Sequence, residues 1–201
     1  MQEFNTKRDP IAWVSEILEA ARAAEGSHPE RDPMRVALAT ADAAGRPSVR
    51  YVLLKGFGPD GFVFYTNYQS AKASDLKANP YAALAFHWWS TGVQLRARGR
   101  VERLSDTESD AYFGSRSRGN QLGAWASNQS RPLESREALE AQLATVAERF
   151  AGQDVPRPPH WGGYRLRPTR LEVWLNGDHR LHDRFEFEHG EGGWTGRRLS
   201  P

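Results

Sequence analysis

The sequence contains no cysteine among its 201 residues. Disulfide bonds, thiolate nucleophiles and zinc–sulfur sites are therefore excluded. The chain also lacks an apolar run near the roughly 18–20 residues that a membrane-spanning helix needs. Its first ten residues, MQEFNTKRDP, have no hydrophobic region of the kind found in a secretory signal peptide. We therefore expect a cytoplasmic protein with no membrane partner.

Neither sign of charge dominates the composition. The 27 Lys and Arg residues are nearly balanced by 25 Asp and Glu residues, and such a balance gives no general case for nucleic-acid binding. Hydrophobic residues make up 39% and aromatic residues 11% of the chain, which is enough to build a core. The length predicts one domain, or one domain with extensions.

Most of the chain after residue 34 has the pattern of β-strands. Short segments rich in Val, Tyr and Phe alternate with turn residues, which predicts strands. These segments are RVALAT (35–40), SVRYVLL (48–54), GFVFYT (61–66), YAALAFHW (81–88), VQLRARGRVERL (93–104), GGYRLR (162–167), TRLEVWL (169–175), DRFEFEH (183–189) and GWTGRRL (193–199). Such a series of strands predicts an antiparallel barrel or sandwich.

Four segments have helical features. Asp9 and Pro10 match an N-cap and a first helical residue, and a second short helix is predicted over 70–78. Ser105 and Glu108 have the spacing of a capping box. A fourth helix is indicated over 139–150, where Leu and Val recur on one face. The expected fold class is α+β, mainly β, in a single domain.

Two patterns that resemble binding sites have simpler explanations. The glycines of residues 56–61 match G-x-G-x-x-G, but Pro59 and Asp60 favour a hairpin turn instead of a dinucleotide loop. His179 and His182 lie three residues apart in a segment predicted as strand or loop, with no carboxylate cluster beside them. We expect no metal site.

Basic residues recur at strand ends and in loops. They are Arg50, Lys55, Lys72, Arg116, Arg118, Arg180 and Arg184. Lys55 follows an apolar run, so its stem is expected to lie against the core. Tyr112 and Arg116 are four residues apart at the end of a predicted helix, hence on one face. The Arg-x-His-x-Arg pattern of residues 180–184 would place three basic groups on one side of a strand. Cations grouped in this way are tolerated where an anion such as a phosphate or a flavin binds.

Several blocks of this sequence resemble the pyridoxine/pyridoxamine 5'-phosphate oxidase family. They are RYVLLK (50–55), FYTN (64–67), Gln94 with Gly99, YFGSRSR (112–118), QLGAWASNQS (121–130), WGGYRL (161–166) and WLNGDHRLHDRF (174–185). Their order and spacing match from about residue 32 to the terminal RLSP. The resemblance implies an FMN-binding split β-barrel with peripheral helices that forms a homodimer. It divides the chain into an N-terminal helix and arm, 1–30, and a split-barrel domain, 31–201, that includes a C-terminal dimerisation and substrate segment.

The resemblance also implies which residues bind the cofactor and the substrate. The implied FMN-binding residues are Arg50, Lys55, Tyr65, Thr66, Lys72, Gln94, Gln129, Ser130, Trp174 and Arg184. The implied substrate-binding residues are Lys55, Tyr112, Arg116, Asn120, Arg180 and His182, and the last two are also the implied catalytic pair. Arg and Lys suit phosphates, and Gln can both donate to and accept from a flavin edge.

Three positions depart from the family pattern. Ala71 stands where an arginine usually contacts the FMN phosphate, so that contact is missing or is supplied elsewhere. Val93 stands where an arginine usually precedes Gln94, and Asn120 replaces a serine that commonly contacts the substrate phosphate. Asn120 still offers a hydrogen-bond donor.

The implied reaction is the FMN-dependent oxidation of pyridoxamine or pyridoxine 5'-phosphate to pyridoxal 5'-phosphate, with dioxygen as acceptor and hydrogen peroxide as product. Arg180 would position the substrate ring and stabilise developing charge, and His182 would orient Arg180 or assist proton movement. Two alternatives stay open. One is a related flavin oxidase acting on another ring, as in phenazine biosynthesis, expected to lack the substrate-phosphate residues. The other is a non-catalytic FMN- or pyridoxal-phosphate-binding protein on the same fold.

Overall fold

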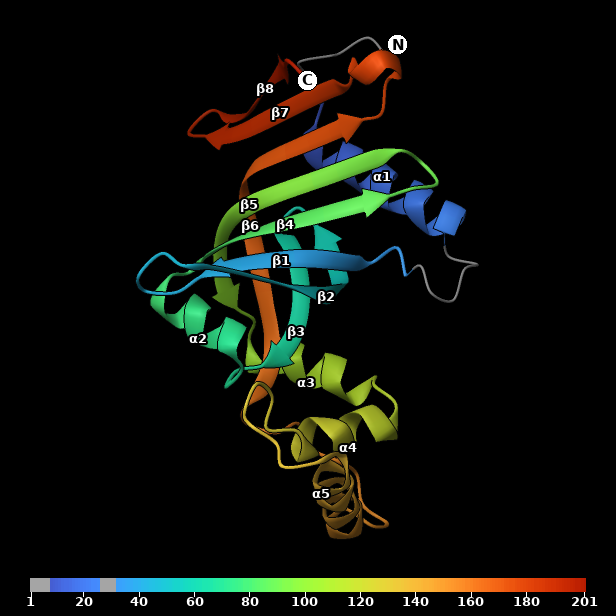
Figure 1. Ribbon diagram of the computed structural model, residues 1–201, viewed down its shortest axis with the longest axis vertical. Helices are drawn as coiled ribbons and strands as arrows, with labels where there is room; N and C mark the ends of the chain where they lie inside the picture. Colours follow the sequence, from blue (N-terminus) through green and yellow to red (C-terminus); the bar gives the residue numbers. More distant parts are fainter. Residues whose placement is uncertain (1–7, 26–31) are drawn as a thin grey trace.

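The structure, a computed structural model, describes residues 8–25 and 32–201. Its central feature is an antiparallel sheet in the order β3-β2-β1-β4-β5-β6-β7-β8, which a β3–β6 pairing closes into a barrel (Figure 1). The strands are β1 Arg35–Ala41, β2 Pro47–Gly58, β3 Gly61–Asn67, β4 Tyr81–Trp88, β5 Val93–Arg103, β6 Trp161–Leu175, β7 Asp183–Gly190 and β8 Gly193–Leu199. Strands β7 and β8 extend the sheet beyond the barrel. The predicted α+β, mainly β, split barrel is confirmed.

The turn between β2 and β3 is the predicted hairpin. Gly58 pairs with Gly61 across Pro59 and Asp60. The glycines therefore belong to a hairpin turn and not to a dinucleotide-binding loop. Gly61 has a φ of +119°, and a Cβ there would lie 2.1 Å from the carbonyl oxygen of Leu166. Only glycine fits this combination of left-handed backbone and close strand approach.

Strand β6 joins two segments that the sequence predicts as separate strands. GGYRLR and TRLEVWL form one strand, with a register shift opposite Arg98 and Gly99 of β5, where Thr169 of β6 is the extra residue. Pro168 lies opposite Gly99 and has no N–H to donate to the ladder, so a bulge accommodates it. Because β6 has 15 residues, it pairs with β5 and β7 at one end and with β3 at the other. That double pairing closes the barrel.

The barrel interior and helix α1 (Pro10–Glu25) form the main hydrophobic core. On β4 and β5 every second side chain is buried, as the alternating sequence predicts. Asp9 caps α1 by accepting from the Ile11 N–H at 3.0 Å. The Trp13 ring of α1 then packs 5.5 Å from Phe185 and 6.0 Å from Phe187 of β7. The helix thus covers strand β7 where it extends past the barrel.

The other helices are α2 Ala71–Ala78, α3 Asp106–Gly114, α4 Arg118–Ala126 and α5 Arg136–Arg149. The predicted capping box at Ser105 and Glu108 is present. The sequence did not predict helix α4, because its segment RGNQLGAWA is short and contains two glycines, which disfavour helix. The predicted apolar face of α5 is wrong in part, since none of its own residues is buried and Leu143 is 39% exposed. Figure 1 shows α3, α4 and α5 gathered at one end of the barrel.

In the described ranges, no helix is long and apolar enough to cross a membrane.

Candidate active site

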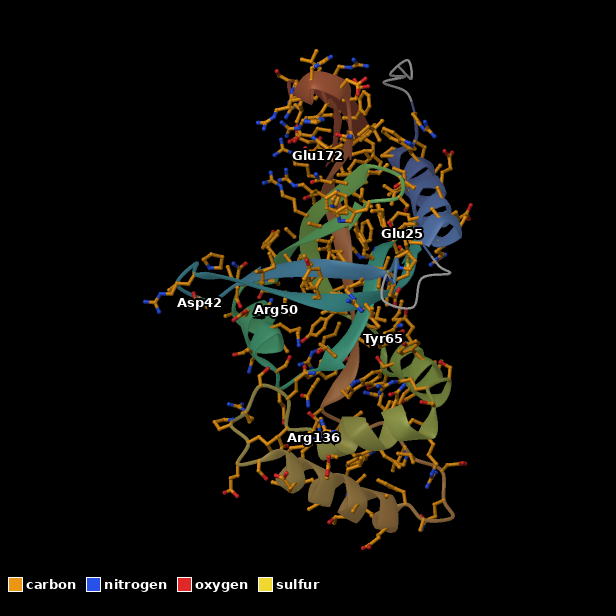
Figure 2. All side chains as sticks on the ribbon, turned by 45° about the vertical axis from the view of Figure 1, so that its right-hand side comes forward. Glu25, Asp42, Arg50, Tyr65, Arg136 and Glu172 are labelled. Atoms are coloured by element: carbon orange, nitrogen blue, oxygen red, sulfur yellow. The ribbon has the colours of Figure 1, made fainter. Side chains whose placement is uncertain are left out.

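A cavity of about 360 Å³ opens beside strands β2 and β3 at the end of the barrel near α3. It is lined by Arg50, Tyr51, Val52, Leu53, Lys55, Tyr65, Thr66, Lys72, Tyr112, Arg116, Gln129 and Trp161. Eight of these residues are ones that the family resemblance implies for cofactor or substrate. Figure 2 labels two of them, Arg50 on β2 and Tyr65 on β3. The β-hairpin, the start of α2, the end of α3 and the loop after α4 therefore meet at one place.

Lys72 is a buried cation whose described partners are all neutral. Its Nζ donates to Gln129 Oε1 at 2.8 Å, to Thr66 Oγ1 at 3.1 Å and to Ser70 Oγ at 3.3 Å. Burial, followed by the nearby charge of Arg50, lowers the Lys72 pKa to about 8. A buried ammonium without a counter-ion is costly. An anion bound at this point would remove that cost.

Arg50 provides the second cation of this region. Its guanidinium donates to Thr40 Oγ1 at 2.5 Å and to Ser48 Oγ at 2.7 Å, and it lies 3.6 Å from an Asp75 oxygen. The same Asp75 oxygen accepts from Thr40 at 2.6 Å. Arg50 is thus held on β2 against β1 with its charge partly balanced. Ala71 is the exposed first residue of α2 and stands where the resemblance implies an arginine. This region therefore has one cation fewer than the family pattern implies.

Three residues implied for the substrate phosphate line the same cavity. Lys55 is exposed, so the expectation that its stem lies against the core is wrong. The strand alternates, and Leu54 takes the buried position at 2% exposure. Arg116 lies beyond the end of α3 at Gly114 and is not on the helix face as predicted. It still reaches Tyr112, whose pKa is raised by burial and lowered to a smaller degree by Arg116.

Asn120 and Ser130 lie next to this cavity and do not line it. Asn120 on α4 lines a neighbouring cavity of about 260 Å³, which shares Arg116, Gln129 and Trp161 with the first. Ser130 follows Gln129 directly and has a φ of +68°. A non-glycine residue in this region costs on the order of 1–3 kcal/mol, and such residues cluster at functional sites.

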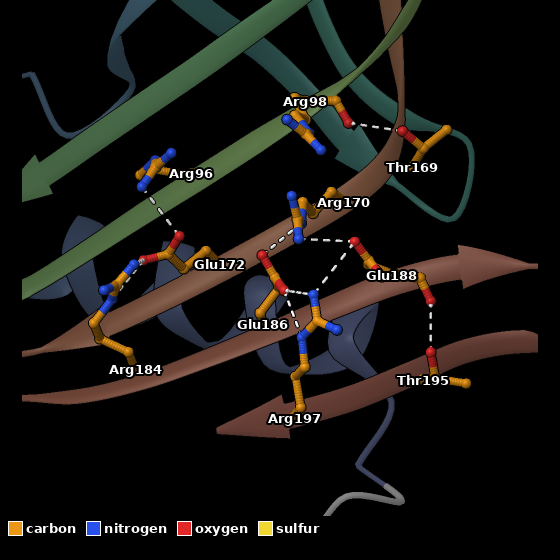
Figure 3. Close-up of polar contacts among 10 residues, drawn as sticks. All are labelled: Arg96, Arg98, Thr169, Arg170, Glu172, Arg184, Glu186, Glu188, Thr195 and Arg197. Carbon is orange, nitrogen blue, oxygen red and sulfur yellow. Dashed lines mark hydrogen bonds and ion pairs between the residues drawn. The ribbon is translucent and has the colours of Figure 1, made fainter. Parts of the chain in front are cut away.

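The other implied cofactor residues form a second group on the sheet. Gln94 on β5 pairs with Trp174 on β6, and Trp174 pairs with Arg184 on β7, so the three form one row across the strands. The Trp174 ring lies 4.4 Å from the His182 ring. Arg184 is bound by Glu172, which accepts from its Nε at 3.0 Å and its Nη2 at 2.8 Å (Figure 3). None of this row lines the cavity that contains Lys72.

The predicted strand geometry of residues 180–184 is wrong. Residues Asp178–Arg180 form a 3-10 turn, and β7 begins only at Asp183. His179 and Arg180 have φ angles of +54° and +63°, so the side chains do not alternate as in a strand. Arg180 is exposed, whereas His182 is half-buried and its Nδ1 accepts from the Gly177 N–H at 3.2 Å. This hydrogen bond requires an unprotonated Nδ1, so neutral His182 carries its proton on Nε2.

The sequence did not single out four residues of the cavity wall, and two of them, Tyr51 and Trp161, carry aromatic rings. Tyr51 is 72% exposed and Trp161 is 7% exposed. Both residues lie in sequence blocks that carry the family resemblance, RYVLLK and WGGYRL. Their place in these blocks could have identified them as site residues. Across the described residues, no group of three or more His, Asp or Glu side chains is arranged to hold a metal ion.

The closed barrel and the cavity beside it, with the buried Lys72 ammonium in its wall, define a protein of the split-barrel class. A family model described as pyridoxamine 5'-phosphate oxidase matches residues 30–150, and one described as the pyridoxine 5'-phosphate oxidase C-terminal dimerisation region matches residues 161–201. The chain belongs to the pyridoxine/pyridoxamine 5'-phosphate oxidase family, a family of oxidoreductases.

Individual relatives agree with this assignment. Proteins named pyridoxine/pyridoxamine 5'-phosphate oxidase from Sphingopyxis alaskensis and Myxococcus xanthus strain DK1622 are 53% and 51% identical over 96% of this chain, covering 88% and 92% of their own lengths. The crystal structure of PhzG from Burkholderia lata 383, in complex with tetrahydrophenazine-1-carboxylic acid, is 32% identical. It has a TM-score of 0.89 and covers 99% of this chain and 95% of its own.

Proposed function

We propose that this protein is an FMN-dependent oxidase that converts pyridoxamine or pyridoxine 5'-phosphate to pyridoxal 5'-phosphate. One observation carries the proposal: four cationic side chains, Arg50, Lys55, Lys72 and Arg116, line a single cavity. Lys72 and Arg50 form a first group, because burial and, after it, the charge of Arg50 lower the Lys72 pKa. Arg116, which interacts with Tyr112, would form a second group with Lys55. Four cations in one cavity suit two phosphate-bearing molecules, a cofactor and a substrate.

The residues fit a phosphorylated flavin at the first group. Lys72 is buried and has no counter-ion within residues 8–25 and 32–201, while Gln129 and Thr66 accept hydrogen bonds from its ammonium. A flavin held there would supply the redox chemistry, which is the transfer of a hydride equivalent from the substrate carbon to dioxygen by way of the cofactor, with hydrogen peroxide as product. The chain itself would bind the cofactor and the substrate, orient them toward each other and exclude water from the site. Tyr65 and Thr66 would contact the cofactor from β3.

The row formed by Gln94, Trp174 and Arg184 supports a homodimer. These implied flavin contacts lie outside the cavity that contains Lys72, although they belong to the same implied site. A second copy that places its row over the first copy's cavity would complete the site. The match of residues 161–201 to a family region described as a dimerisation region supports the same arrangement.

Arg180 and His182 are the proposed catalytic pair. Arg180 is exposed on a turn with left-handed backbone at two successive residues, so its side chain is accessible to a substrate ring. His182 is held by the Gly177 N–H and by the Trp174 ring. With its proton on Nε2, His182 can donate a hydrogen bond from that atom. We propose that Arg180 stabilises developing charge and that His182 assists proton movement or orients Arg180.

A second candidate function comes from the similarity to PhzG, whose structure contains a tetrahydrophenazine carboxylic acid. A flavin oxidase acting on such a ring needs no phosphate-binding group for its substrate. The cluster of Lys55, Tyr112 and Arg116 favours the phosphorylated vitamer instead. A non-catalytic flavin-binding protein is the third candidate.

Oxygen consumption separates these candidates. Purified protein is loaded with FMN and supplied in air with pyridoxamine 5'-phosphate, with unphosphorylated pyridoxamine, or with a tetrahydrophenazine carboxylic acid. The proposal expects aldehyde and peroxide from the phosphorylated amine at a kcat/KM at least about 10-fold above that of pyridoxamine, because one charge-assisted contact contributes about 1.5–3 kcal/mol. Turnover of the tetrahydrophenazine alone would support the second candidate, and no turnover of any substrate would support the third.

A further inference from the structure

Arg116 has an unusual environment for a half-buried arginine. It forms no ion pair with a carboxylate in residues 8–25 and 32–201, and its Nη1 is buried without a hydrogen-bond partner there. Burial lowers the pKa of Arg116, and the interaction with Tyr112 offsets this only in part. The charge and the hydrogen-bond donors of this side chain are therefore available to a ligand. Something other than an acid must hold the guanidinium in place.

Aromatic rings hold it. The Arg116 guanidinium carbon lies 4.6 Å from the ring centroid of Trp161 and 5.7 Å from that of Phe113. An arginine stacks well on an aromatic face, and the attraction grows when water is excluded. Such a contact fixes the plane of the guanidinium and leaves its N–H groups free at the edge. We propose that Trp161 is a positioning residue that orients Arg116 toward the substrate phosphate, an inference that rests on the proposed function.

Trp161 also sets the position of Tyr112. The rings of Tyr65 and Tyr112 are stacked at 3.8 Å, and the Trp161 plane is within 12° of Tyr65 and within 6° of Tyr112. The three rings and Arg116 line the same cavity. Two of the implied phosphate ligands, Tyr112 and Arg116, thus share one aromatic support.

The support itself is tied to α3. Arg157 donates from Nη1 to the Trp161 carbonyl at 2.7 Å, and it also binds Asp106 at 2.7 Å and Asp110 at 2.5 Å. The start of β6, which carries Trp161, is therefore linked to the helix that carries Tyr112. Phe113 adds an edge contact at 5.2 Å from the Trp161 ring. The ring that supports Arg116 is fixed by covalent neighbours and by α3 together.

Arg184 shows the opposite way of holding an arginine. In Figure 3 Glu172 bridges Arg96 and Arg184, with Arg96 Nη1 at 3.0 Å from the second Glu172 oxygen. The carboxylate orients Arg184 and neutralises part of its charge. An arginine that must bind a phosphate dianion gains from being oriented without neutralisation, because the full Coulomb attraction remains for the ligand. Stacking on Trp161 achieves this for Arg116.

The inference is tested with FMN-loaded enzyme and two substrates, pyridoxamine 5'-phosphate and pyridoxamine. Trp161→Leu should raise KM for the phosphorylated substrate roughly 10-fold, the loss expected for a desolvated cation–π contact. It should leave kcat within about 3-fold and pyridoxamine kinetics unchanged. Trp161→Phe keeps a ring and should fall in between. In an Arg116→Met background, Trp161→Leu should add little, because the contact is already lost.

Trp125 is the matched control, since Arg149 lies 4.9 Å from its ring centroid and neither residue lines the cavity. Trp125→Leu removes a contact of the same kind and should leave KM unchanged. Equal losses with both substrates after Trp161→Leu, or full additivity with Arg116→Met, would show a purely structural role and overturn the proposal. If Trp161→Leu does not fold, Trp161→Phe alone and combined with Arg116→Met gives the same comparison.

The outcome stays separable from that of the proposed function. If wild-type enzyme oxidises neither substrate, the proposed function fails, and titration with inorganic phosphate then decides the inference without turnover. A dissociation constant that Trp161→Leu weakens by roughly 10-fold, and that Trp125→Leu leaves unchanged, supports the inference. Equal phosphate affinity in wild type and Trp161→Leu refutes it.

Discussion

Lys72 should make FMN affinity depend on pH in a range where few other groups titrate. Its pKa in the protein without ligand is lowered to about 8 from an ordinary value of 10.5. A phosphate dianion beside the ammonium favours the charged form and returns the pKa toward or above its ordinary value. FMN binding is then coupled to proton uptake at Lys72. Affinity should be nearly constant below about pH 7.5 and fall as pH rises through about 8.

The size of the effect follows from the two pKa values. The pKa of Lys72 is about 8 in the free protein, and its ordinary value is 10.5. A complex that restores the ordinary value raises the dissociation constant about 30-fold between about pH 7 and pH 9.5, or about 2 kcal/mol. The FMN phosphate has a second pKa of about 6 and stays a dianion throughout. Burial raises the pKa values of Tyr65 and Tyr112 above 10.0, so both stay neutral in this range.

Stability of the apo protein should change in the opposite direction. The unfolded chain holds the Lys72 proton up to 10.5, whereas the folded chain loses it near 8. Between these values the unfolded state binds more protons, and stability therefore rises with pH. Relative to Lys72→Met, wild-type apo protein should gain about 2 kcal/mol between about pH 7 and pH 9.5.

Flavin fluorescence quenching gives the dissociation constants, and denaturant titration of the apo protein gives the stabilities. Lys72→Met removes the titrating group and should give a flat, weaker FMN profile, whereas Lys72→Arg should stay charged and give a flat, tighter one. A wild-type affinity that is flat from pH 7 to 9.5, or a Lys72→Met profile as steep as wild type, would refute the placement of the cofactor phosphate at Lys72.

Three further predictions concern the substrate, the missing arginine and the dimer. In steady-state assays Arg116→Met should raise KM about 10–100-fold with little change in kcat. Arg180→Met should also lower kcat, and Arg180→Lys should not restore it. Equal effects of Arg116→Met and Arg180→Met on kcat and KM would contradict the separate roles of the two residues. Ala71→Arg should tighten FMN about 10–100-fold by equilibrium titration, since a charge-assisted hydrogen bond contributes about 1.5–3 kcal/mol; an unchanged dissociation constant would place the phosphate elsewhere. Light scattering should show a dimer near twice 22.6 kDa that FMN stabilises against dilution, and an active monomer would rule out a shared site.

Much of the fold could be predicted because its signals are local. The alternation in β4 and β5, the turn at Pro59 and Asp60, and the capping box at Ser105 each depend on residues within a few positions of one another. The residue types of the site could also be predicted from the sequence, because Lys, Arg and Gln have the side chains that suit phosphate and flavin binding. The family resemblance then assigned those types to positions such as Lys72 and Arg116.

Only the tertiary structure decided which of those residues share a cavity. The β3–β6 pairing brings residues 62–67 against residues 161–166 and places Trp161 beside β3, while the chain after α3 brings Arg116 onto the Trp161 ring. The burial that lowers the Lys72 pKa likewise depends on Thr66 and Gln129 closing around it. Desolvation is a property of the packed surroundings and has no local sequence signal.

The turn at residues 178–182 shows the limit of a local pattern most directly. Arg-x-His-x-Arg has the spacing of a strand, yet the chain forms a 3-10 turn with two left-handed residues, His179 and Arg180. Gly177 lets the turn close, because a Cβ there would lie 2.2 Å from the Leu181 carbonyl oxygen. The His182 ring then contacts Trp174 of β6. The sequence by itself determined the chemistry of this segment, whereas long-range packing against β6 decided its backbone conformation, since tertiary contacts outweigh a weak local preference for strand.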